Sequence, residues 1–199
     1  VDSLELVQDK SVLVGARRYG VLIASNYKIQ TLDPKLFDIP WQERVLSVNI
    51  HHPKETIEFH TAYIPPGSTN RWKKIETLEG IYKQLAVQTD RKRILCGDFN
   101  TPQDELVQYG AVTFAQKINK IGVPKLKESF RGGSGKRWDE GERKILEGLK
   151  EYNLIDAYRH IHPIPKKAYS FEFVRKGKVV SQRRFDHFFS SKELNPKSA

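Results

Sequence analysis

The segment from residue 44 to residue 85 constrains the fold most, because its hydrophobic period changes from that of a strand to that of a helix. RVLSVNI (44–50) and TIEFHTAYI (56–64) are rich in β-branched and aromatic residues, which predicts two strands. The polar connection HHPKE between them has a length typical of antiparallel neighbours. GVLIAS (20–25) has the same character and predicts a further strand upstream.

A helical period follows these strands directly. Apolar residues recur every three or four positions, and Lys, Glu and Gln fill the opposite face. The apolar positions are Trp72, Ile75, Leu78, Tyr82 and Leu85. We therefore expect an amphipathic helix capped by Ser68, Thr69 or Asn70.

The second half of the chain repeats this alternation. RILC (93–96) predicts a strand, a helix is expected around 142–152, and short strands are expected near 169–174 and 184–190. The glycine-rich RGGSGKR (131–137) indicates a loop. Strands interleaved with two peripheral helices predict an α+β fold in which sheet packs on sheet and the helices lie outside.

The composition fits one domain over residues 1–199, which we expect to be a monomer. The 34 Lys and Arg residues exceed the 24 Asp and Glu residues, so the net charge of +10 favours a polyanionic partner such as nucleic acid or an acidic membrane surface. Cys96 is the single cysteine, which points to a reducing compartment and an intracellular, cytoplasmic location. No stretch approaches the length of a membrane span.

Polar side chains stand where several strands are expected to end. In ILCGDFNTP, Asp98 and Asn100 follow an apolar run and precede a proline. Such residues are also common in turns, so these two alone leave a structural interpretation open. RFDHFF places Asp186 within an apolar strand, LIDAYRH places Asp156 at a strand end, and Tyr63 precedes two prolines. Polar groups at several strand ends are typical of an active site along one edge of a sheet.

The motifs GDFNTPQDE, HTAYIPPGS, ERKILEGLKEYNLIDAYRHIHP with YSFEF, and RRFDHFF together resemble the endonuclease/exonuclease/phosphatase superfamily. The likeness covers nearly the whole chain, keeps the family's motif order, and is strongest to the exonuclease III and abasic-site endonuclease branch. It implies a four-layer αββα sandwich, with two packed, mostly antiparallel sheets flanked by helices. It also implies hydrolysis of phosphate esters that depends on Mg²⁺, or on Mn²⁺ in its place.

The resemblance also implies roles for individual residues. Asp98 would orient or deprotonate the attacking water. Asn100, pointing the same way two residues along the strand, would hold the phosphate or the metal shell, so both are candidate metal ligands. Tyr63 would lie beside the leaving group or the phosphate, and Asp186 would orient a histidine. These oxygen-rich groups suit both Mg²⁺ and in-line attack on a phosphodiester.

The chain departs from the family pattern at both ends. No Ser-Asp-His motif follows Ser190, and no Gln-Glu motif precedes Gly20 at the expected distance. Gln8 and Asp9 lie too close to Gly20 to take that role. We therefore expect the chain to lack both ends of the family domain, with the principal glutamate ligand outside it, and to have little activity alone. His187 would point away from Asp186 because side chains alternate along a strand.

Substrate contacts are expected from Arg159, Arg183, Arg184 and Phe171, because the basic run RKGKVVSQRR (175–184) leads into RFDHFF. YSFEF is consistent with core packing, and it also resembles the segment that shapes the sugar pocket of abasic-site enzymes, although Glu172 replaces an aromatic residue there. The leading hypothesis is a DNA endonuclease or exonuclease. The alternatives are a non-catalytic DNA-binding module and a phosphatase for phospholipids or inositol phosphates. The histidines match no standard zinc spacing.

Overall fold

The structure, a computed structural model, describes residues 20–164 and 166–197 and has a six-stranded sheet at its centre. The strand order is β1-β2-β3-β4-β14-β11. The strands are β1 (Lys28–Thr31), β2 (Val45–His52), β3 (Glu55–Tyr63), β4 (Lys92–Asp98), β11 (Ile155–Asp156) and β14 (Asp186–Ser190). Strands β3 and β4 are parallel, and the other neighbours are antiparallel. The predicted antiparallel pair on either side of HHPKE is confirmed as β2 and β3.

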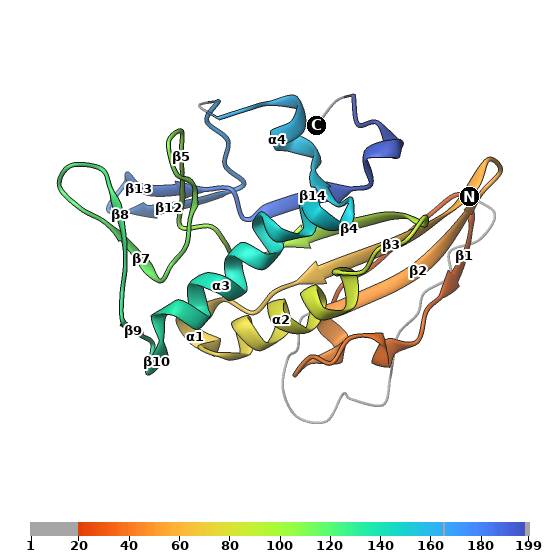
Figure 1. Cartoon of the computed structure of the whole chain (residues 1–199), viewed down its shortest axis with the longest axis horizontal. Helices are drawn as coiled ribbons and strands as arrows, with labels where there is room; N and C mark the ends of the chain where they lie inside the picture. Colours follow the sequence, from red (N-terminus) through yellow and green to blue (C-terminus); the bar gives the residue numbers. More distant parts are fainter. Residues whose placement is uncertain (1–19, 165, 198–199) are drawn as a thin grey trace.

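Two helices cover one face of this sheet (Figure 1). They are α2 (Lys73–Leu85) and α3 (Gly135–Leu146), and the shorter helices are α1 (Gly67–Asn70) and α4 (Ala157–Ile161). The core between helices and sheet contains Ile75, Leu78, Ile81 and Leu85 of α2, Trp138 and Ile145 of α3, and Ala62, Leu95 and Phe189 of the sheet. Because Leu95 faces the helices, alternation turns Cys96 and Asp98 toward the other face. Short 3₁₀ segments span Pro34–Leu36, Gln42–Arg44, Gly148–Tyr152 and Lys192–Leu194.

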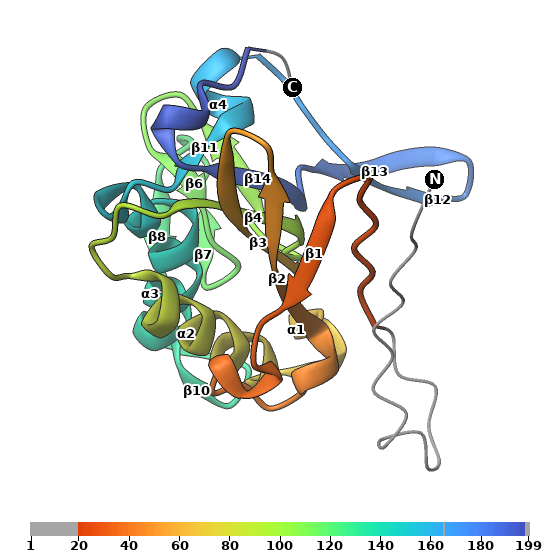
Figure 2. The same cartoon turned by 90° about the vertical axis from the view of Figure 1, so that its right-hand side faces the viewer.

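The remaining strands pair as small hairpins around one end of the sheet (Figure 1). The pairs are β5 (Asp104–Leu106) with β6 (Gly110–Val112), β7 (Gln116–Ile118) with β8 (Pro124–Leu126), β9 (Ser129–Phe130) with β10 (Gly133–Ser134), and β12 (Phe171–Arg175) with β13 (Lys178–Arg183). The β12–β13 hairpin projects on the side of the sheet opposite to α2 and α3 (Figure 2). Its residues are mostly exposed.

Three expectations about individual elements are wrong. Residues 20–25 form no strand, and the first described strand begins at Lys28. The loop expected at 131–137 instead contains the start of α3, where the Ser134 hydroxyl accepts a hydrogen bond from the Arg137 N–H at 3.2 Å and caps the helix. Helix α2 begins after Trp72 without a side-chain cap, because residues 67–70 form α1.

A glycine is required at position 97, next to the last residue of β4. Its φ of 134° is a backbone conformation that other residues rarely adopt, and a Cβ at this position would lie 1.9 Å from the carbonyl oxygen of Ala62. The glycine before Asp98 therefore lets β4 lie close to β3 at the residue where both strands end.

Helices packed against a multi-stranded sheet confirm the predicted α+β class. Within the described part of the chain, no helix has the length and apolar character needed to cross a membrane. Gln8 and Asp9 lie outside the described residues.

Candidate active site

Three of the four predicted catalytic residues form one row across the sheet. In the strand register, Asp98 of β4 lies directly opposite Tyr63 of β3 on one side and Asp186 of β14 on the other. Directly opposite residues on neighbouring strands carry their side chains on the same face. The sheet therefore brings Tyr63, Asp98 and Asp186 together at the end where β3 and β4 stop and β14 starts.

Asn100 joins this row through a turn. It has a φ of 50°, so it lies outside the strand rather than two residues along it as expected. Its backbone N–H donates to Asp98 Oδ1 at 2.8 Å, and its side-chain Nδ2 donates to Asp98 Oδ2 at 3.3 Å and to the Ile64 carbonyl at 2.9 Å. The Asn100 amide group is thus held against the Asp98 carboxylate.

The environment of Asp98 makes its carboxylate a stronger base than that of an ordinary aspartate. Burial is the main cause that raises the pKa of this carboxyl above its ordinary value, and the charge of Asp186 raises it further. The Asn100 N–H, Lys74 and His187 act in the opposite direction but do not cancel the effect. A carboxylate with a raised pKa is better suited to accept a proton from water than an ordinary aspartate.

Asp186 is exposed, which differs from the expectation that it lies within an apolar strand interior. It is the first residue of β14, so water solvates its carboxylate. The Ser170 hydroxyl accepts hydrogen bonds from the backbone N–H groups of Phe185 and Asp186 at 3.0 and 2.9 Å and fixes the start of the strand. His187 is buried on the opposite face, as alternation predicted.

Two buried side chains, Lys74 and His187, hold the loop that follows Asp98, and the sequence analysis predicted neither of these contacts. Lys74 Nζ donates to the Asn100 carbonyl at 2.7 Å, and His187 Nε2 lies 2.8 Å from the Thr101 carbonyl. Lys74 stands four residues before Leu78, on the apolar stripe of α2, and this position was the available signal. Consecutive carbonyls of the loop are therefore fixed from two sides.

The structure places two of the four predicted substrate-binding residues in a buried ion network. Arg159 donates to both oxygens of Glu105 at 3.0 and 2.5 Å. Arg184, which is 7% exposed, donates to Glu105 at 2.9 Å and to Asp156 at 2.6 Å. Burial raises the pKa of Asp156, but His187 and Arg184 outweigh it and hold the pKa below its ordinary range. This arrangement assigns Arg159, Arg184 and Asp156 to support of the site, because their charged groups are already paired.

Phe171 and Arg183 lie at the base of the β12–β13 hairpin, beside the start of β14. The Phe171 ring stacks on Phe185 with centroids 5.0 Å apart, and the Arg183 guanidinium lies 5.3 Å from the centre of the Phe114 ring. Because Phe185 immediately precedes Asp186, Phe171 and Arg183 lie beside the row formed by Tyr63, Asp98 and Asp186.

Two cavities adjoin the start of β14. One of about 540 Å³ has a mainly apolar lining that includes Tyr158, Tyr169, Asp186 and Phe188. Another of about 250 Å³ is lined by Arg159, Lys166, Lys167, Arg183 and Arg184 together with Asp104 and Glu105. Asp186 lines the larger cavity, and Arg184 and Tyr169 line both.

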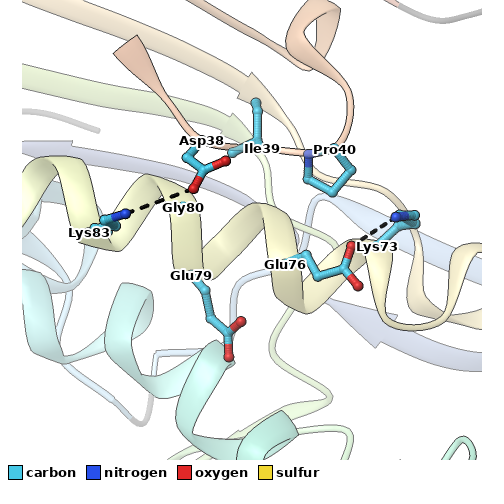
Figure 3. Close-up of a pocket in the computed structure, with 8 residues that line it drawn as sticks. All are labelled: Asp38, Ile39, Pro40, Lys73, Glu76, Glu79, Gly80 and Lys83. Atoms are coloured by element: carbon cyan, nitrogen blue, oxygen red, sulfur yellow. Dashed lines mark hydrogen bonds and ion pairs between the residues drawn. The ribbon is translucent and has the colours of Figure 1, made fainter. Parts of the chain in front are cut away.

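A third cavity is a groove of about 470 Å³ between residues 38–40 and α2, and it is separate from the site (Figure 3). Its charged residues are already paired, Lys73 with Glu76 at 2.9 Å, Lys83 with Asp38 at 3.8 Å, and Glu79 with Arg137 at 2.7 Å. Gly80 allows this approach, because a Cβ there would lie 2.3 Å from the Asp38 carbonyl oxygen. The groove is a consequence of loop packing on the helix.

The site offers oxygen donors of the kind that Mg²⁺ prefers. Within residues 20–164 and 166–197, no group of three or more His, Cys, Asp or Glu side chains is arranged to hold a metal ion. Asp98 and Asp186 nevertheless lie directly opposite each other, and Asn100 adds an amide oxygen. Mg²⁺ is commonly bound through one or two carboxylates, with waters and substrate phosphates as further ligands. The residues present therefore fit a magnesium ion shared with a phosphate-containing substrate.

No protein-family model and no curated protein matches this sequence. Solved structures do match. An AP endonuclease from Archaeoglobus fulgidus has a TM-score of 0.54 and 18% sequence identity, over 86% of this chain and 62% of its own. The AP endonuclease LMAP from Leishmania major has a TM-score of 0.48 and 19% identity, over 76% and 47% of the two chains. D. rerio TDP2 complexed with single-strand DNA product has a TM-score of 0.46 and 10% identity, over 82% and 52%.

The first of these matches shows that the chain has the fold of an AP endonuclease. This agrees with the resemblance of its motifs to the endonuclease/exonuclease/phosphatase superfamily. The chain spans less than two thirds of the length of each of the three proteins.

Proposed function

We propose that this chain belongs to a magnesium-dependent phosphodiesterase that cleaves DNA. One observation carries the proposal: Asp98 and Asp186 lie directly opposite each other on neighbouring strands, with Tyr63 in the same row. Like charges in directly opposite positions destabilise a sheet, so such a pair needs a compensating function or a bound cation. A cation between two carboxylates and a phosphate satisfies this requirement.

The roles of the residues follow from their environments. Asp98, with its raised pKa, accepts the proton of the attacking water. Asn100 fixes the Asp98 carboxylate through two hydrogen bonds and presents its amide oxygen to the metal or the phosphate. Tyr63 contributes its hydroxyl near the leaving oxygen. Mg²⁺, held by Asp98, Asn100 and Asp186, would supply positive charge to the phosphoryl oxygens.

Nucleic acid is the substrate class that the surface favours. The β12–β13 hairpin carries Arg175, Lys176 and Lys178 at its tip, all exposed, and Phe171 and Arg183 at its base. Cations that follow a phosphate backbone, together with aromatic rings on which bases stack, are typical of nucleic-acid surfaces. We propose that the hairpin contacts the strand that is cleaved.

The test uses the protein at its natural length. We expect it to nick duplex DNA with Mg²⁺ and to lose cleavage in EDTA. Asp98→Ala should reduce kcat on the order of 10³-fold or more, because it removes a group required in the transition state. Glu140→Gln, an exposed carboxylate on α3, is the control and should leave kcat unchanged.

Two results would reject the proposal. Cleavage that persists without a divalent metal or in Asp98→Ala would show that the catalytic groups lie elsewhere. Tight, salt-sensitive DNA binding without any cleavage would instead identify a non-catalytic binding module.

A further inference from the structure

A buried ion pair outside the catalytic row contacts the loop that carries Asn100. Lys74 of α2 is 1% exposed and Glu142 of α3 is fully buried. Lys74 Nζ lies 2.5 Å from Glu142 Oε1 and 2.7 Å from the Asn100 carbonyl oxygen. The Glu142 carboxylate also accepts hydrogen bonds from Trp138 Nε1 at 2.8 Å and from the Phe114 N–H at 2.9 Å. We propose that this pair is a positioning device for the Asn100 loop, an inference that rests on the proposed function.

A contribution to folding stability does not by itself explain why Lys74 and Glu142 are buried together. Two charges removed from water carry a desolvation penalty, and a well-packed apolar replacement of a buried ion pair is often neutral or stabilising. Two aromatic rings offset part of this penalty by cation–π contact, since the Lys74 ammonium lies 4.8 Å from the centre of the Phe114 ring and 5.9 Å from that of Trp138. An apolar pair could not reproduce the hydrogen bond to the Asn100 carbonyl, nor the two that Glu142 accepts from Trp138 Nε1 and the Phe114 N–H. Of these three, only the first acts directly on the candidate site.

The hydrogen bond from Lys74 stabilises the backbone of Asn100, which has an unfavourable conformation. Asn100 has a φ of 50°, which is uncommon for a residue other than glycine. Its carbonyl is held by a charged donor, which makes a stronger hydrogen bond than a neutral one. With the carbonyl fixed, the Asn100 N–H and side-chain amide point back to Asp98. Lys74 thus determines where Asn100 stands relative to Asp98 without touching the substrate.

Helix α3 takes part because Glu142 fixes the ammonium group. Its carboxylate contacts Lys74, the Trp138 indole and the backbone N–H of Phe114. The same side chain therefore connects α2, α3 and the segment after β6. Without Glu142, Lys74 would lose the carboxylate that it contacts directly.

The experiment separates positioning from stability with three variants. Lys74→Met removes the donor but leaves Glu142 charged and buried. Lys74→Met/Glu142→Gln removes both charges and should recover most of the melting temperature lost in the single variant. Arg93→Met is the matched control, because Arg93 is a 2% exposed cation that donates to the Leu85 and Tyr152 carbonyls at the opposite end of β4.

Positioning predicts that kcat of the double variant stays lowered, on the order of 10- to 100-fold, although its melting temperature recovers and KM changes little. Arg93→Met should lower the melting temperature but keep kcat. The side-chain amide NMR resonances of Asn100 should shift in the double variant and not in Arg93→Met, and this readout does not require activity.

The inference is overturned if kcat returns together with the melting temperature, or if the Asn100 resonances stay at their wild-type positions. Either result would make the pair a purely structural contact. Failure of the proposed function is visible separately, as cleavage that survives Asp98→Ala.

Discussion

Glu58 shows at the scale of one residue how burial and partners set the charge of a side chain. It is 8% exposed, and a hydrogen bond from His60 is the main cause that lowers its pKa from 4.5 to about 2, with Arg91 contributing further. A carboxylate whose pKa is lower in the folded state stabilises the fold above pH 4.5, and this stabilisation is lost as the pH falls toward 2. We expect Glu58→Gln to lose about 3 kcal/mol of unfolding free energy at pH 7.

Urea unfolding measured from pH 7 to pH 2 checks this expectation. The difference between the wild type and Glu58→Gln should shrink steadily below pH 4.5. Glu140→Gln, whose partner Lys136 is 3.8 Å away on an exposed helix face, should differ from the wild type by less than about 1 kcal/mol throughout. If the difference in unfolding free energy between the wild type and Glu58→Gln did not change with pH, the charge of Glu58 would not contribute to stability.

The candidate site could be predicted from polar residues that stand at the ends of apolar strands. Asp98, Asn100 and Tyr63 stand where apolar strands end, and the sequence therefore marked them. Lys74 was assigned to the solvent face of its helix because lysine is rarely buried, although its spacing from Leu78 placed it on the apolar stripe. Its role depends on Glu142, a partner 68 residues away, which no local pattern reveals.

At the scale of elements, an ion network joins three segments that are distant in the sequence but in contact in the structure. Glu105 of β5 accepts hydrogen bonds from Arg159 of α4 and from Arg184, which precedes β14. Burial raises the pKa of Glu105, but the two arginines outweigh this effect and lower it. Glu105→Gln would leave two largely buried cations facing a neutral amide, so we expect a loss of about 3 kcal/mol.

Thermal unfolding of Glu105→Gln is the measurement. Glu79→Gln is the matched control, because Glu79 also binds an arginine through both oxygens, Arg137 at 3.0 and 2.7 Å, but on the surface. That pair should contribute less than about 1 kcal/mol. Equal losses in the two variants would show that the network is no stronger than a surface ion pair.

Elements with a clear period were predictable, and those defined by long-range pairing were not. Strands β2, β3 and β4 and helix α2 appear where the alternation and the helical stripe predicted them. Residues 20–25 have strand composition but pair with no strand in the described part of the chain, and they are irregular. The register that sets Asp186 opposite Asp98 joins segments about 90 residues apart and became visible only in the sheet.

The whole molecule combines a net charge of +10 with a hairpin that extends from the sheet beside the candidate site (Figure 2). If this hairpin binds the DNA backbone, its cations release counter-ions on binding, and the affinity falls as salt rises. Each neutralised phosphate contributes about 0.9 to the slope of log K against log salt on duplex DNA. We expect Lys176→Ala/Lys178→Ala to reduce this slope by about 1 to 2.

The control removes the same charge from a distant surface. Lys35→Ala/Lys54→Ala has an equal net charge, and both lysines are exposed, Lys35 in the 3₁₀ segment Pro34–Leu36 and Lys54 in the turn between β2 and β3. Fluorescence anisotropy with a labelled duplex, between about 50 and 200 mM salt, gives the slope for each variant. If only net charge mattered, both double variants would weaken binding equally, because long-range attraction depends on the total charge. A smaller slope in the hairpin variant alone therefore identifies phosphate contacts at the hairpin, and equal slopes in all three proteins would exclude it from the interface.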